Sequence, residues 1–153
     1  MKNMRNKTNV TYVDIKYYSM NNTVRCDLTY EININKWPIF GFTIDSDILC
    51  NVAEKLGAKY IVTDKKTNYP FAFGFKVTAK ATCDMEQDSY DETTGKQIAL
   101  TRAQAKAFEK TCKFYDFIQI ELDKSFSEIT RVIDNCWHAS NKCWDHAKEL
   151  GNY

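Results

Sequence analysis

The sequence is poor in the residues from which catalytic sites are most often built. It has only two histidines, His138 and His146, and its five glycines are scattered, so no glycine-rich phosphate-binding loop is present. No Gly-x-Ser-x-Gly occurs, and no cysteine has a histidine nearby except in the C-terminal region where both histidines lie. We therefore expect a protein that is not an enzyme and that uses no cofactor.

Long apolar runs and a large net charge are also missing. No run approaches the roughly 20 apolar residues that span a bilayer, and residues 1–9 are polar, without the apolar core of a signal peptide. The formal net charge of +1 gives no bulk attraction to nucleic acid or to a membrane. These absences predict a cytoplasmic protein that has no membrane partner and does not bind nucleic acid strongly by itself.

The six cysteines have spacings that do not suit a metal site. No two of them are separated by two to four residues, as in a zinc knuckle. Cys136 and Cys143 lie two helical turns apart, and only Cys143 and His146 have a spacing that could share one ion. We expect no bound metal, and we interpret most of the cysteines as small buried apolar residues.

The first half of the chain carries strand patterns. Residues 10–18 are β-branched and aromatic, and residues 23–33 alternate between apolar and polar side chains about an Asn21-Asn22 turn. A short helix is expected after Asp45 or Ser46, ending at Gly57, with further strands at 58–63 and 73–83. The pattern predicts an α+β fold: an antiparallel sheet of four to five strands with a short helix and long amphipathic C-terminal helices.

Residues 98–150 carry a hydrophobic repeat of 3.5 residues with no proline or glycine between 96 and 150. Such a repeat keeps one stripe of a helix against a partner. Ser125 and Glu128 resemble a capping box, so we expect a break near 123–125 and two helices, at 94–122 and 126–150. We expect one domain over 1–153, mainly sheet to residue 92 and helical from 93. The 98–150 seam should pack partly on the sheet and partly on a second copy, as a homodimer.

Three groups of side chains are candidate binding residues. An acidic connector without Lys or Arg could imitate phosphates and occupy a basic groove on a nucleic-acid enzyme; its members are Asp84, Glu86, Asp88, Asp91 and Glu92. Trp137 and Trp144 lie beside the seam, either as core against the sheet or as a contact surface for another chain. Lys76, Lys80 and Arg102 could hold a signalling nucleotide. Each group also has a simpler reading, as helix-terminal acids, packing residues and a solvated sheet face.

A stretch of the chain resembles small phage- and prophage-encoded accessory proteins. In those proteins a strand ending in Ala/Val-x-Cys is followed by Asp-x-Phe-Asp and then by a helix with Gly-x-x-x-Ala and Arg-Ala. The matching segments here are Lys80-Ala81-Thr82-Cys83, Asp88-Ser89-Tyr90-Asp91, Gly95-Lys96-Gln97-Ile98-Ala99, Arg102-Ala103 and Lys106-Ala107. Tyr90 replaces the phenylalanine. The resemblance covers residues 80–107 and implies a phage or mobile-element origin. Proteins of this kind are often inhibitors of host defence, including anti-CRISPR proteins.

The leading expectation is therefore a non-enzymatic inhibitor that binds a bacterial defence protein or ribonucleoprotein, with the acidic connector as phosphate mimic. One alternative is a sponge for a signalling nucleotide. A second alternative is a phage structural or assembly protein that dimerises through the seam.

Overall fold

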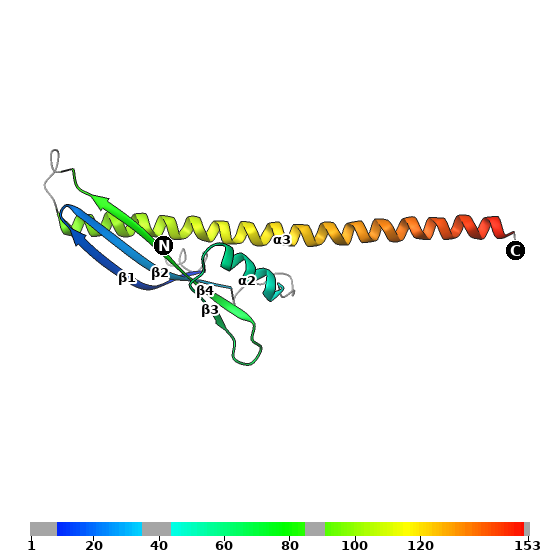
Figure 1. Cartoon of the computed structure of the whole chain (residues 1–153), viewed down its shortest axis with the longest axis horizontal. Helices are drawn as coiled ribbons and strands as arrows, with labels where there is room; N and C mark the ends of the chain where they lie inside the picture. The colour runs from blue at the N-terminus through cyan, green and yellow to red at the C-terminus, as the bar shows by residue number, and fades with distance from the viewer. Residues whose placement is uncertain (1–8, 35–43, 85–90, 152–153) are drawn as a thin grey trace. The chain divides into compact units, whose positions relative to one another are not determined.

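The computed structural model describes residues 9–34, 44–84 and 91–151. The chain has an α+β fold with a curled, four-stranded antiparallel sheet, a short helix and a long C-terminal helix (Figure 1). The strands are β1 (Val10–Met20), β2 (Thr23–Asn33), β3 (Tyr60–Thr63) and β4 (Pro70–Thr82), in the order β1-β2-β4-β3; the helices are α2 (Ser46–Lys55) and α3 (Glu92–Leu150). The chain comprises two compact units, Met1–Asp116 and Phe117–Tyr153.

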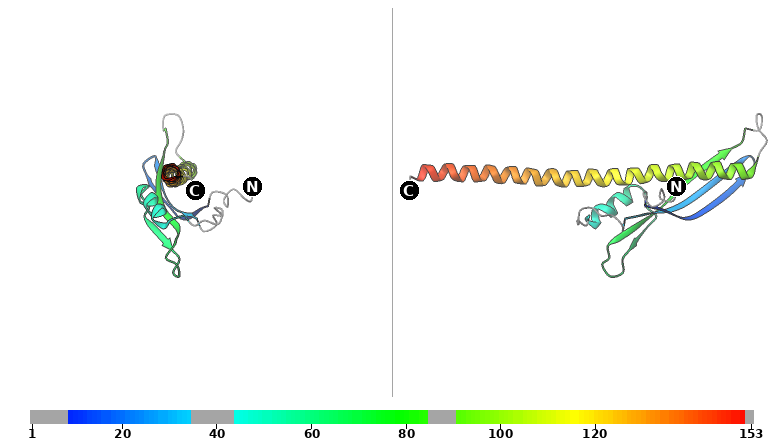
Figure 2. Two further views of the ribbon diagram at one scale, coloured as in Figure 1. Left: turned by 90° about the vertical axis from the view of Figure 1, so that its right-hand side faces the viewer. Right: turned by 180° about the vertical axis from the view of Figure 1, so that it is seen from behind.

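The β1–β2 hairpin forms where the sequence predicts it. Asn21 takes a left-handed conformation with φ of 55°, which asparagine tolerates better than most residues. The register pairs Met20 with Thr23 and Tyr17 with Cys26, and a β-bulge lies between Tyr12 and Asp14. Bulges increase the local twist of a strand pair, and Figure 2 shows the strong twist of the sheet from two further sides.

The predicted alternation of buried and exposed side chains along β2 and β4 is confirmed. The register pairs Leu28 with Val77 and Tyr30 with Phe75, so the apolar residues of both strands share one face. The buried residues of this face are Val24, Cys26, Leu28, Tyr30, Ile32, Phe73, Phe75, Val77, Ala79 and Ala81. The two central strands therefore supply the core of the first unit.

Helix α2 has the predicted caps. The Asp45 side chain accepts a hydrogen bond of 2.9 Å from the backbone N–H of Asp47, and Gly57 takes a positive φ of 80° just beyond the helix. Its buried face consists of Leu49, Val52 and Ala53. Strand β3 pairs with β4 only as far as Gly74. The rest of that edge of β4 has no strand partner among the described residues.

The N-terminal part of α3 packs on the sheet through small residues. Ala99, Ala103 and Ala107 are fully buried at four-residue intervals. A Cβ atom on Gly95 would lie 2.9 Å from Cγ2 of Val24, so the helix approaches the sheet closely. Further along, the Phe114 ring lies 5.3 Å from the Phe73 ring and 6.3 Å from the Phe75 ring, between centroids.

This packing corrects the predicted seam. Ile98 and Phe108 are seam residues, yet 41% and 38% of their surfaces are exposed, while the alanines on another side of the helix are buried. The seam was assigned from a 3.5-residue spacing that begins at Ile98, whereas the residues buried on the sheet follow four-residue steps that begin at Ala99. In this part of α3 the predicted seam is therefore not the face that packs on the sheet.

The predicted helix break is also wrong. Helix α3 runs without interruption from Glu92 to Leu150, through the expected break at 123–125. Ser125 does not cap a second helix; its hydroxyl donates to the backbone carbonyl of Glu121, four residues earlier, at 3.2 Å. Ser127 and Thr130 donate in the same way to the carbonyls of Asp123 and Phe126. Back-bonding to the preceding turn lets these hydroxyls lie inside a continuous helix.

Candidate interaction surface

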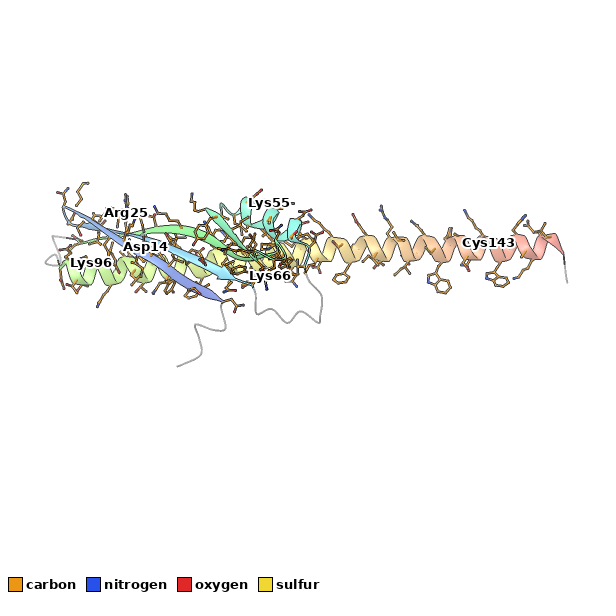
Figure 3. All side chains as sticks on the ribbon, turned by 90° about the horizontal axis from the view of Figure 1, so that it is seen from below. Asp14, Arg25, Lys55, Lys66, Lys96 and Cys143 are labelled. Carbon is orange, nitrogen blue, oxygen red and sulfur yellow. The ribbon has the colours of Figure 1, made fainter. Side chains whose placement is uncertain are left out.

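One side of the second unit's helix carries a row of exposed apolar side chains, here called the apolar stripe. At 100° per residue its members occupy an arc of about 140° and a length of about 36 Å. They are Phe126, Ile129, Val132, Ile133, Cys136, Trp137, Ser140, Cys143, Trp144, Ala147 and Leu150, with Ser140 as the polar member. Cys143 is labelled on the helix in Figure 3.

The large members of the stripe are mostly exposed. The exposed fractions are 65% for Phe126, 67% for Trp137 and 69% for Trp144. Val132, Ile133, Cys136, Trp137 and Ser140 line a shallow open groove on the stripe. Within the chain the two tryptophans are thus surface residues and not core against the sheet, which leaves the predicted contact surface as their remaining interpretation.

The side of the helix opposite the stripe is polar. Lys124, Arg131, His138 and Lys142 lie there, and Lys124 forms an ion pair of 3.2 Å with Glu121. His146 Nδ1 lies 3.6 Å from a carboxylate oxygen of Glu149. Exposed pairs such as these contribute about 0–1 kcal/mol each. The second unit therefore has one face suited to water and one suited to burial.

The acidic connector is described only in part. Glu86 and Asp88 lie outside the described residues. Asp91 accepts hydrogen bonds from the backbone N–H of Thr93, at 3.1 Å, and from the Thr94 hydroxyl, at 2.6 Å. The Thr94 hydrogen bond is the main cause that lowers the pKa of Asp91, with further help from backbone N–H groups of the first turn and some opposition from desolvation. Asp91 thus begins α3, as its position in the sequence predicts.

Two other acids of the connector also lie beside regular elements. Glu92 accepts a hydrogen bond of 2.9 Å from the Ser19 hydroxyl and forms an ion pair of 3.6 Å with Lys96. Asp84 follows the end of β4. Negative charge at a helix N-terminus is stabilised by the helix dipole. The described geometry of Asp91 and Glu92 is therefore that of a helix start.

The predicted basic residues are only partly brought together. Lys76 and Lys80 share the polar face of β4. Lys76 Nζ lies 3.5 Å from the buried carboxylate of Asp27, which also pairs with Arg25 at 3.3 Å and accepts a hydrogen bond of 2.9 Å from Thr78. Sequence reasoning missed this cluster, because Asp27 meets Lys76 and Thr78 only through the β2–β4 register.

Arg102, the third predicted nucleotide-binding residue, contacts the backbone of β4. Its guanidinium donates to the backbone carbonyl of Lys80 at 2.8 Å, and Lys106 donates to the carbonyl of Thr78, also at 2.8 Å. These carbonyls belong to the part of β4 beyond its pairing with β3. The two cations therefore satisfy an open strand edge, which otherwise offers unpaired backbone groups.

The cysteines are less buried than expected. Cys26 is buried, Cys50 and Cys83 are half-buried, and Cys112, Cys136 and Cys143 are exposed. Burial raises the pKa of the Cys26 thiol. Over residues 9–34, 44–84 and 91–151, no three His, Cys, Asp or Glu side chains gather as a metal site would require.

None of the helices in the described ranges combines the length and the apolarity needed to cross a bilayer. Compared with protein-family models, with curated proteins and with solved structures, the chain matches none.

Proposed function

We propose that this protein acts without catalysis, by docking onto another protein chain through the apolar stripe of α3. The observation that carries the proposal is the exposure of Phe126, Trp137 and Trp144 in one row on one side of a helix. Contiguous apolar patches of this kind mark interaction sites, and tryptophan is enriched among the residues that contribute most to binding. An amphipathic helix that lies in a partner's apolar groove or bundle is a common mode of recognition.

The proposed target is a bacterial defence complex, and the proposed effect is inhibition, with anti-CRISPR activity as the first case to test. The resemblance of residues 80–107 to phage accessory proteins supports this target class. Of the acidic connector, Asp91 and Glu92 have partners in their own unit. The stripe supplies the main docking surface in this proposal.

A plating assay tests the proposal. A bacterium with an active CRISPR system that targets a phage would express the wild-type chain, the double variant Trp137→Ala with Trp144→Ala, or the control double variant His138→Ala with Lys142→Ala. Alanine is a strong helix former, and the control residues lie on the polar side of the same turns. We expect the wild type and the control to restore plaques, and the tryptophan variant to lose most of that effect.

Two results would count against this proposal. Full plaque recovery by the tryptophan variant would exclude the stripe as the docking surface for inhibition. No recovery by the wild type would exclude the CRISPR target. In that second case the stripe itself is still tested by the association measurements below.

The 3.5-residue repeat favours a second candidate function, a phage structural or assembly protein that associates with itself. In that case the stripe would be buried between copies of the chain. The nucleotide-sponge alternative has less support, because Lys76 pairs with Asp27 and Arg102 donates to the backbone of β4.

A further inference from the structure

We infer that the apolar stripe packs against the stripe of a second copy, antiparallel, about a two-fold axis at the level of His138. The inference rests on the second candidate function, self-association through the stripe, and places a second copy on the surface to which the first proposal docks a host protein. It has three supports: the area of the stripe, its repeat, and the order of large and small residues along it.

The exposed apolar area is sufficient for a stable pair. An aromatic side chain offers about 200 Å², so three aromatic residues that are two-thirds exposed present about 400 Å². Four aliphatic residues are each at least half exposed and together add roughly 200 Å²; they are Ile129, Val132, Ile133 and Leu150. If all of this area were covered, two copies would together bury roughly 1,200 Å², the lower end of the range of specific interfaces.

The repeat indicates that the partner is a helix of the same kind. Phe126, Ile133, Ser140 and Ala147 follow one another at seven-residue intervals, and so do Ile129, Cys136, Cys143 and Leu150. Two helices with this repeat supercoil so that both stripes stay in contact along their length. A second copy carries the matching stripe, and a two-fold contact uses the same patch on both chains.

Residue size determines the direction of the pair. The large core residues Phe126, Ile129 and Ile133 occupy the first part of the stripe, and small residues occupy 136–147. A parallel pair would place large on large at one end and small on small at the other, so no single helix spacing would fill both. An antiparallel pair with complete overlap instead gives the facing pairs Phe126 with Leu150, Ile129 with Ala147, Ile133 with Cys143, and Cys136 with Ser140. Two of these pairs, Ile129 with Ala147 and Ile133 with Cys143, set a large residue against a small one, so the space between the helices is filled more evenly than in a parallel pair.

The antiparallel arrangement also places the tryptophans of the two copies side by side. Trp137 and Trp144 both widen the stripe on one flank. A two-fold axis perpendicular to the helices brings that flank of each copy against the same flank of the other. The two Trp137 rings would then lie about 3 Å apart along the axis, close enough to stack. In a parallel pair they would instead face the other flank, which carries Ser125, Val132, Ala139 and His146.

Sedimentation equilibrium and cysteine cross-linking test the inference. We expect the full-length wild type to be a dimer. Ile133→Asp should raise the dimer dissociation constant at least a hundredfold, because it places a charge in the interface. Asn135→Asp adds the same charge on the polar side and should leave the constant nearly unchanged. Circular dichroism would show whether both variants remain helical.

The cross-link reports the direction. In a background of Cys112→Ser and Cys143→Ser, Cys136 is the remaining exposed cysteine of α3. In an antiparallel pair the two Cys136 residues are displaced by about 6 Å along the axis, in addition to the spacing between helices, which is too far for a disulfide. Treatment with copper phenanthroline should therefore cross-link this background poorly. Adding Ser140→Cys should produce a disulfide-linked dimer.

Each contrary outcome has its own meaning. Efficient cross-linking through Cys136 alone would overturn the antiparallel direction in favour of a parallel pair. If the wild type is a monomer and its inhibition still depends on Trp137 and Trp144, the partner of the stripe is not a second copy. Docking onto a host protein would then remain. A monomer whose inhibition is independent of the stripe would overturn both.

Discussion

At the scale of single residues, Asp91 explains where α3 begins. Its carboxylate accepts hydrogen bonds from Thr93 and Thr94 in the first turn of the helix. A charged carboxylate also interacts favourably with the positive end of the helix dipole. The ionised form is therefore the one that the folded chain favours.

This preference gives a pH prediction. The Thr94 hydroxyl is the main cause that holds the pKa of Asp91 below the ordinary value of 3.8 in the folded chain. The stabilisation from Asp91 is therefore present above this value and is lost as the pH falls through the lower, folded-state pKa. We expect the amide chemical shifts of Thr93 and Thr94, followed by NMR from pH 6 to 2, to titrate with a midpoint below 3.8.

Asp91→Asn is the matched control, because asparagine also caps a helix but does not ionise. Its Thr93 and Thr94 amides should show no such titration. A wild-type titration midpoint at or above 3.8 would contradict the hydrogen bonds from Thr93 and Thr94 to Asp91.

Single residues also mark where the sequence was insufficient. The acid at position 91 and the glycine at 57 were predictable, because caps depend on neighbours in the chain. The partner of Arg102 was not predictable. The Lys80 carbonyl is open to a side-chain donor because β3 pairs with β4 only as far as Gly74. Strand register and edge exposure are set by tertiary structure, which a local pattern does not contain.

At the scale of elements, the strands were more predictable than the long helix. Alternation along β2 and β4 places their side chains correctly, since the period of a strand is two. For α3, Ala99, Ala103 and Ala107 form the packing face, and alanine carries a weak hydrophobic signal beside Ile98 and Phe108. The break expected at Ser125 failed because a serine hydroxyl can bond back within a helix as well as cap one.

The close approach of α3 to β2 predicts the effect of a single methyl group. Gly95→Ala should lower the free energy of unfolding by about 1 kcal/mol, because overpacking against the buried Val24 outweighs the gain in helix propensity. Val24→Ala should make room for the added methyl. In that background we expect Gly95→Ala to be neutral or stabilising.

Urea unfolding of the four chains in this double-mutant cycle measures the coupling between the two positions. Equal effects of Gly95→Ala in both backgrounds would show that Val24 and Gly95 are not in close contact.

At the scale of the whole molecule, the two units obtain their stability differently. The first unit has a buried core of two central strands, α2 and the alanine face of α3. The second unit is described as helix with its apolar stripe exposed. Helices without a packed face are marginal in water, so this account requires the stripe to be covered when the protein functions. The repeat could be predicted from the sequence. The exposure of Trp137 and Trp144 could not, because it depends on the fold.

Hydrogen–deuterium exchange across α3 tests this claim most directly. We expect the amides of residues 126–150 to be protected in the wild type above the dimer dissociation constant. Their protection should decrease on dilution and in the variant Trp137→Ala with Trp144→Ala, while residues 99–114 remain protected. If residues 126–150 exchange at the same rate in the wild type and in the variant at every concentration, the stripe is not the contact between copies, and self-association through it is contradicted.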